Sequence, residues 1–150
     1  MAVETRVVDA AGALRAWVNA QTDLVGKGKP LANGVHLSRP RSTSQGAIGW
    51  VQEITPSIVT DGYHDARLSF EVTAVGSEEG ARGSALTACK ALANTVLDGI
   101  RRPATVTTGL GEDVRLLWAD PESAQGPSFS GDVTGEALYR WDVTIRCQPG

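Results

Sequence analysis

Two long stretches of the chain alternate between apolar and mostly polar residues, which is the period of a β-strand with one buried face. In residues 66–74 the apolar set is Ala66, Leu68, Phe70, Val72 and Ala74, and between these lie Arg67, Ser69, Glu71 and Thr73. In residues 137–147 the two sets are Ala137, Tyr139, Trp141, Val143, Ile145 and Cys147, and Leu138, Arg140, Asp142, Thr144 and Arg146. Each stretch predicts a long strand that buries one face and presents the other to solvent.

A long helix is predicted between these two strands. Ser77 is placed to cap its first amide groups, and two glutamates follow in the first turn, where the helix dipole favours negative charge. An apolar stripe then continues to Gly99, formed by Ala85, Leu86, Cys89, Leu92, Ala93, Val96 and Leu97. Gly80 and Gly83 weaken the first turns by up to about 1 kcal/mol each relative to alanine. We therefore expect this helix to lie flat on a sheet, with either a close approach or fraying near the two glycines.

The first part of the chain predicts a shorter helix and two strands. Helical spacing of apolar residues begins after Asp9, a capping residue, and ends at Gly26, which favours a helix between them. Residues 35–39 and 48–54 predict two strands joined by a polar loop at residues 40–46. Pro56 and the turn at residues 61–62 are expected to break the chain before the next strand.

After the long helix the sequence predicts a hairpin and a long loop. Residues 105–108 and 114–118 are strand-like, and the glycines between them, Gly109 and Gly111, can supply the positive φ angles of a turn. Residues 120–135 are rich in Pro, Gly, Ser and Asp and predict a loop. That loop is long for an inert connection, so we expect it to have a role.

Length and element order define the fold class. A chain of 150 residues, 41% hydrophobic, can bury one core and is too short to expect two independent domains. We predict an α+β fold in which two helices pack on a mixed, largely antiparallel β-sheet, with residues 1–150 as a single domain. The two cysteines lie far apart and suggest no disulfide framework. There is no signal peptide pattern and no apolar run near the roughly 18 residues of a membrane span, so we expect a soluble protein made in the cytoplasm and no membrane partner.

The charge balance argues against binding of nucleic acid. The net charge is −3, and residues 76–150 hold seven basic and ten acidic residues. Four arginines could contact phosphates, but no aromatic platform accompanies them in sequence; they are Arg39, Arg41, Arg101 and Arg102. The last two also complement the negative end of the preceding helix, which explains them without a ligand.

No segment carries a convincing reaction centre. His36 and His64 are the only histidines, and His36 alternates with apolar neighbours as on the outward face of a strand. His64 lies in a polar cluster at residues 61–65 that offers one imidazole and two carboxylates, so a polar turn before a strand is favoured over a metal site. The glycines and lysines at residues 26–29 follow a helix and precede Pro30, which is not the context of a phosphate-binding loop. The four tryptophans are expected in the core or in a subunit interface. We predict no enzyme, no catalytic residue, no cofactor and no metal.

The order of elements resembles the tail terminator family of long-tailed bacteriophages. The resemblance lies in residues 65–72, in the Ser-Glu-Glu opening of the Ala-rich helix at residue 77, and in the closing strand at residues 138–146, which follows Gly126, Pro127 and Asp132 and carries an aromatic-basic pair and a late arginine. It covers most of the chain. The glycines of the helix and the length of the loop at residues 120–135 depart from the family pattern. Neighbouring head-tail connector and tail completion proteins look related.

The resemblance implies a structural virion protein at the head-proximal end of the phage tail, assembled in the host cytoplasm. Such a protein forms a homo-oligomeric ring, usually of six copies, on the last ring of the major tail tube protein. It ends tube polymerisation and offers a surface to the head-tail connector protein. DNA passes through its lumen without specific binding, and the acidic second half of this chain is compatible with such a lining.

A closed ring needs two different patches on each subunit, which two loops and the polar strand faces can supply. The candidate residues for contact with the next subunit or the tail tube are Arg39, Arg41, Gln45, Arg67, Glu71, Glu122, Phe129, Asp132, Arg140 and Arg146. Two alternatives remain open. One is a head-tail connector or tail completion protein on the portal side, and the other is a small-ligand-binding or enzymatic α+β domain with a pocket near Tyr63 and His64.

Overall fold

The computed structural model describes residues 8–38, 46–60, 63–75, 78–120, 128–133 and 136–150; the side chains of residues 53–60, 78, 120, 128–133 and 136 are not part of the description. The chain runs through α1 (Ala10–Asn19), β1 (Val35–His36), β2 (Ile48–Thr60), β3 (Tyr63–Val75), α2 (Glu78–Gly99), β4 (Ala104–Thr107), β5 (Asp113–Asp120), β6 (Ser128–Val133) and β7 (Glu136–Pro149).

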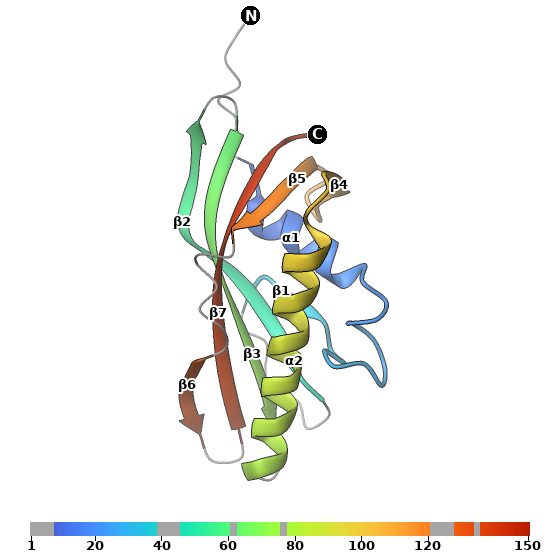
Figure 1. Ribbon diagram of the computed structural model, residues 1–150, viewed down its shortest axis with the longest axis vertical. Coiled ribbons are helices and arrows are strands. Elements are labelled where there is room, and N and C mark those ends of the chain that lie inside the picture. The colour runs from blue at the N-terminus through green and yellow to red at the C-terminus, as the bar shows by residue number, and fades with distance from the viewer. Residues whose placement is uncertain (1–7, 39–45, 61–62, 76–77, 121–127, 134–135) are drawn as a thin grey trace, which may run out of the picture.

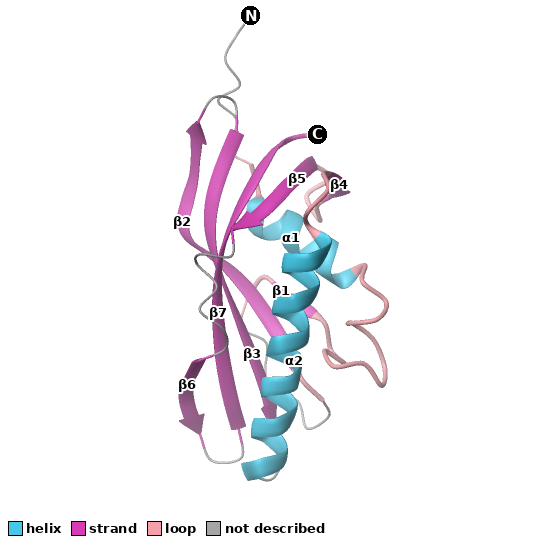
Figure 2. Ribbon diagram, viewed as in Figure 1, coloured by secondary structure: helices cyan, strands magenta, loops and turns pink. Residues whose placement is uncertain are grey.

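These strands form one mixed sheet, and the α+β prediction is confirmed. The strand order is β1-β2-β3-β7-β5-β4, and β6 pairs with β7. The β1–β2 pair is parallel and the other pairs are antiparallel. Both helices lie on the same side of the sheet (Figures 1 and 2). We call that side of β3 and β7 the inner face and the opposite side the outer face.

The core lies between the helices and the inner face of β3 and β7, as the alternation predicted. Phe70 pairs with Trp141 in the β3–β7 register, and their rings stack with centroids 5.6 Å apart. Every apolar residue assigned to a buried face in these two strands is buried. From α2 the buried side chains include Cys89, Leu92 and Val96. Burial of one aromatic side chain removes roughly 150–250 Å² from water, so this stacked pair contributes strongly to the core.

The predicted loop at residues 120–135 contains a strand, which corrects the sequence interpretation. β5 pairs with the C-terminal part of β7, from Thr144 to Pro149, whereas β6 pairs with its N-terminal part, from Glu136 to Arg140. Both strands run antiparallel to β7 and pair with it along the edge that β3 leaves open. β6 is only six residues long and contains a glycine, so its residue types favour a loop, and pairing with β7 overrides them.

The first helix is shorter than predicted. Its N-cap is confirmed, because Asp9 Oδ1 accepts a hydrogen bond from the amide of Gly12 at 2.9 Å. The helix ends at Asn19, whose side-chain amide exchanges two hydrogen bonds of 2.9 Å with the backbone of Val35 in β1. The apolar residues beyond it still reach the core without a helix, since Leu24 and Leu31 are buried and joined by a backbone hydrogen bond.

Pro56 does not end the strand in which it lies, contrary to the prediction. β2 continues to Thr60, with register irregularities between Glu53 and Thr55 and between Thr55 and Ile58. Pro56 lies within the second irregularity, between Thr55 and Ile58, where the ladder to β3 is interrupted. A proline that cannot donate to a ladder is tolerated at an edge or a bulge.

Candidate interface on the outer face of the sheet

Four of the candidate contact residues lie together on the outer face. Arg67 and Glu71 come from β3, and Arg140 and Arg146 come from β7. Glu71 stands opposite Arg140 in the register of the two strands. The other candidates do not enter this arrangement: Arg39, Arg41, Gln45 and Glu122 lie outside the described residues, and Phe129 and Asp132 lie on β6, where only the backbone is described.

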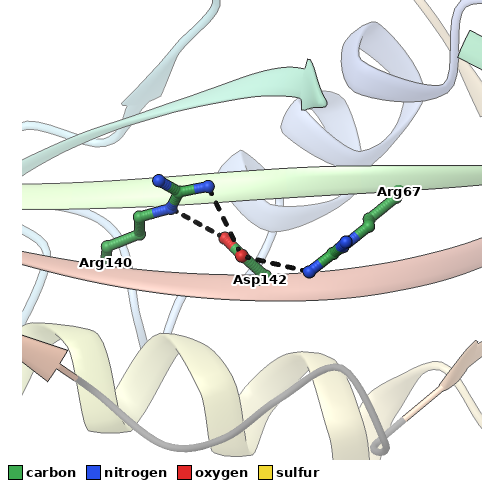
Figure 3. A network of polar contacts seen from close by, with 3 residues as sticks. All are labelled: Arg67, Arg140 and Asp142. Atoms are coloured by element: carbon green, nitrogen blue, oxygen red, sulfur yellow. Dashed lines mark hydrogen bonds and ion pairs between the residues drawn. The ribbon is translucent and has the colours of Figure 1, made fainter. Parts of the chain in front are cut away.

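Two arginines of the outer face share one carboxylate (Figure 3). Arg140 donates from Nε to Asp142 Oδ1 at 3.0 Å and from Nη2 to Oδ2 at 3.4 Å. Arg67 approaches the same carboxylate from β3, with Nη2 3.7 Å from Oδ2. Asp142 is the most buried of the three, with its side chain 20% exposed against 52% for Arg67 and 42% for Arg140. The trio therefore carries one surplus positive charge on exposed guanidinium groups.

A second polar contact holds Arg146 near the end of β7. Its guanidinium forms a bidentate pair with Asp65 and lies over two aromatic rings, 5.3 Å from the centroid of Tyr63 and 5.0 Å from that of Trp118. The hydrogen bonds from Arg146 hold the pKa of the Asp65 carboxyl below its ordinary value, an effect that partial burial opposes. This pair is pre-organised, because both charged groups and the two rings are fixed by neighbouring strands.

The sequence identified the arginines of this face but missed their partners. Asp65 and Arg146 are 81 residues apart, so their pairing depends on the β3–β7 register, which no local pattern reveals. Trp118 was expected in the core or an interface and lies half-buried beside Arg146. A usable signal was the shared parity of Asp142 with Arg140 and Arg146, which places all three on one face once β7 is accepted as a strand.

The outer face is less open than its polar residues predicted. Ser69 and Thr73 were assigned to the exposed set, but both are buried. The Thr73 hydroxyl donates to the carbonyl oxygen of Ala137 at 3.0 Å, which ties the two central strands together. The Ser69 hydroxyl is buried without a hydrogen-bond partner in the described part of the chain. Exposure on this face therefore falls mainly on the long charged side chains.

The two histidines occupy positions that differ in burial. His64 belongs to β3 rather than to a polar turn, and it is 1% exposed and paired in register with Cys147. Its placement follows the alternation of β3, since even-numbered residues of that strand face the core. His36 is half-buried, and its Nε2 lies 3.1 Å from the carbonyl oxygen of Asn33.

Other chemistry-bearing groups in the described residues do not gather. Within those residues no three of the His, Cys, Asp and Glu side chains lie close enough together to hold a metal ion. Burial raises the pKa of the Cys89 thiol to about 11, so this sulfur is a poor nucleophile at neutral pH. In the described ranges, no helix has the length and apolar character needed to cross a membrane.

Comparison with models of known protein families gives no match, and comparison with curated proteins gives no significant relative.

Proposed function

We propose that this chain is a structural subunit that forms a ring at the head-proximal end of a phage tail, where it ends polymerisation of the tail tube and offers a surface to the head connector. The subunits contact one another and the last tube ring. The phage assignment comes from the sequence resemblance, and the position of the charged residues supports a role in assembly.

The observation that carries the proposal is the outer face of β3 and β7. Arg67, Glu71, Arg140 and Arg146 lie on it together, away from the side on which the helices build the core. Arg67 is more than half exposed, and among the described side chains its ion pair is the 3.7 Å contact with Asp142, so its charge is available to a partner. Exposed guanidinium groups held on a regular strand can form charge-assisted, bidentate contacts that set orientation as well as attraction.

Purified full-length chain, alone and mixed with tail-tube subunits, tests this proposal by electron microscopy and native mass spectrometry. Rings and tubes that stop growing when the chain is added are the expected result. Charge reversal in Arg67→Glu should lower the yield of capped tubes at least ten-fold, whereas the matched reversal Arg102→Glu, at an exposed site after α2, should not change it. A wild-type chain that stays monomeric at high concentration and in the presence of tube subunits would refute the proposal.

Capture of a portal-side connector ring in place of the tail tube would also overturn it and favour the connector alternative. A tight small ligand in the native mass spectra of a monomer would favour the binding-domain alternative.

A further inference from the structure

The turn between β4 and β5 presents a leucine to solvent. Leu110 is 82% exposed, the most exposed of the large hydrophobic side chains in the described residues. The turn around it is closed by hydrogen bonds from Thr108 N to the Glu112 carbonyl at 2.8 Å and from Gly111 N to the Thr108 carbonyl at 2.9 Å. Gly111 adopts the positive φ of 80° that such a turn requires. The leucine is therefore held outward on a fixed turn rather than on a loose one.

A groove beside the N-terminal half of α2 has room for an apolar side chain. It has a volume of about 440 Å³ and lies between the loop after α1, the start of β2 and the first half of α2, with small residues predominating among Gly28, Lys29, Pro30, Gly46, Ala47, Gly83, Ser84 and Thr87. Gly83 faces open space, since a methyl group added there would meet nothing within 4 Å. A second groove of about 220 Å³ shares Gly83. The helix is thus accessible at the glycine where a close approach was anticipated.

The charges beside the turn and beside the groove are complementary. Asp113, three residues after Leu110, is exposed and carries a negative charge beside the turn. On the groove side, Lys29 lines the opening and Lys27 is exposed nearby. Opposite charges on two docking surfaces steer encounter and fix orientation.

We propose that Leu110 of one copy inserts into the Gly83 groove of the next copy, with the carboxylate of Asp113 facing Lys27 and Lys29. This rests on the proposed self-assembly and deepens it by assigning the contact between subunits. In Figure 1 the strands β4 and β5 that flank the turn lie beside the C-terminal end of α2. The groove is lined by Gly83, Ser84 and Thr87 from the N-terminal half of that helix, so one copy cannot fill its own groove. Two different patches on each copy make a heterologous contact, which is the kind that closes a ring.

Mixing two variants tests this contact. Leu110→Ser removes the inserted side chain but leaves the groove, and Gly83→Met fills the groove but leaves the leucine. Each variant alone should lose ring assembly, with self-association weakened at least ten-fold in sedimentation velocity. An equimolar mixture should recover one contact per pair and stop at a 1:1 dimer. The matched control Leu37→Ser, at another exposed leucine, should assemble as the wild type does.

A charge exchange supplies a second measurement. Lys29→Glu should weaken assembly, and combining it with Asp113→Lys should restore at least part of the loss. Wild-type rings together with unchanged rings from both Leu110→Ser and Gly83→Met would overturn this contact while leaving the proposed function standing. A mixture of the two variants that remains monomeric would also overturn it. A wild-type chain with no rings, alone or with tube subunits, would instead remove the proposed function on which the contact rests.

Discussion

Arg146 donates two hydrogen bonds to Asp65, from Nε to Oδ1 at 2.7 Å and from Nη2 to Oδ2 at 2.9 Å, and so links the end of β7 to the start of β3. The same guanidinium lies over the rings of Tyr63 and Trp118, and Trp118 belongs to β5. Three strands therefore meet at one side chain on the outer face. The contact is bidentate, and both charged side chains are about 70% buried, so the guanidinium is held in place on that face.

Replacing Arg146 with lysine should destabilise the fold although the charge is kept. A lysine ammonium cannot form the bidentate pair and stacks less well on aromatic rings, so we expect a loss of about 1–2 kcal/mol in the free energy of unfolding. Urea denaturation measures it. The matched change Arg67→Lys, at an exposed guanidinium with one long contact, should cost less than about 0.5 kcal/mol. Equal losses for both variants would contradict a special role for Arg146.

The pair should also make stability depend on pH in the acid range. The folded-state pKa of Asp65 lies below the ordinary value of 3.8, so the carboxylate stabilises the fold fully at pH values above the unfolded-state pKa. That contribution is lost as the pH falls from about 4 through the lowered folded-state value. In Asp65→Asn, the deficit in unfolding free energy relative to wild type should be constant from pH 5 to 7 and shrink below pH 4. A deficit that grows on acidification would show the opposite sign of linkage.

Local periodicity predicted the central part of this fold well. In β3, β7 and α2 one face of the element is buried, so apolar side chains recur at the short period of a strand or a helix. A local reading of the sequence detects that period. The predicted C-terminal limit of α1 was wrong: the helix ends at Asn19, where the side chain of that residue is hydrogen-bonded to the backbone of Val35 in β1, a tertiary contact that local spacing does not reveal. The formation of β6 and the continuation of β2 past Pro56 likewise depend on strand pairing and on an irregularity in the ladder, which a local stretch of sequence does not reveal.

The candidate interface was predicted only as a set of outward residues. The alternation of residues predicted that Arg67, Arg140 and Arg146 lie on the polar faces of two strands, and they lie there in the structure. Arg140 meets Asp142 on its own strand, whereas the pairs Arg67–Asp142 and Arg146–Asp65 follow from the register between β3 and β7. The burial of Ser69 was missed as well, because its small polar side chain carries no local sign of being covered.

Replacing the buried indole of Trp141 should lower the stability of the fold by less than its size suggests. Trp141 is 1% exposed, and its Nε1 has no hydrogen-bond partner among the described residues. An unsatisfied buried donor costs about 1–3 kcal/mol, so Trp141→Phe removes that cost while it loses ring area against Phe70. We expect a net loss below about 2 kcal/mol, compared with about 3–5 kcal/mol for Phe70→Ala, which opens a cavity in the same stack. Thermal unfolding of both variants measures the difference. A loss of stability for Trp141→Phe as large as that for Phe70→Ala would argue against a destabilising, unpaired N–H group at Trp141.

Two glycines of α2 should respond in opposite ways to the same substitution. Alanine is favoured over glycine in a helix by up to about 1 kcal/mol, and a methyl group at Gly83 meets nothing within 4 Å, so Gly83→Ala should stabilise the fold by about that amount. At Gly99 the added methyl would lie 2.5 Å from Cη2 of Trp17, a residue that is 92% buried and cannot withdraw without disturbing the core. Overpacking of this kind costs about 1–3 kcal/mol, more than the gain in helix propensity, so Gly99→Ala should be destabilising. Urea denaturation at low protein concentration, where assembly does not contribute, compares the two variants directly. A stabilised Gly99→Ala would contradict the close approach of Trp17 to this end of α2.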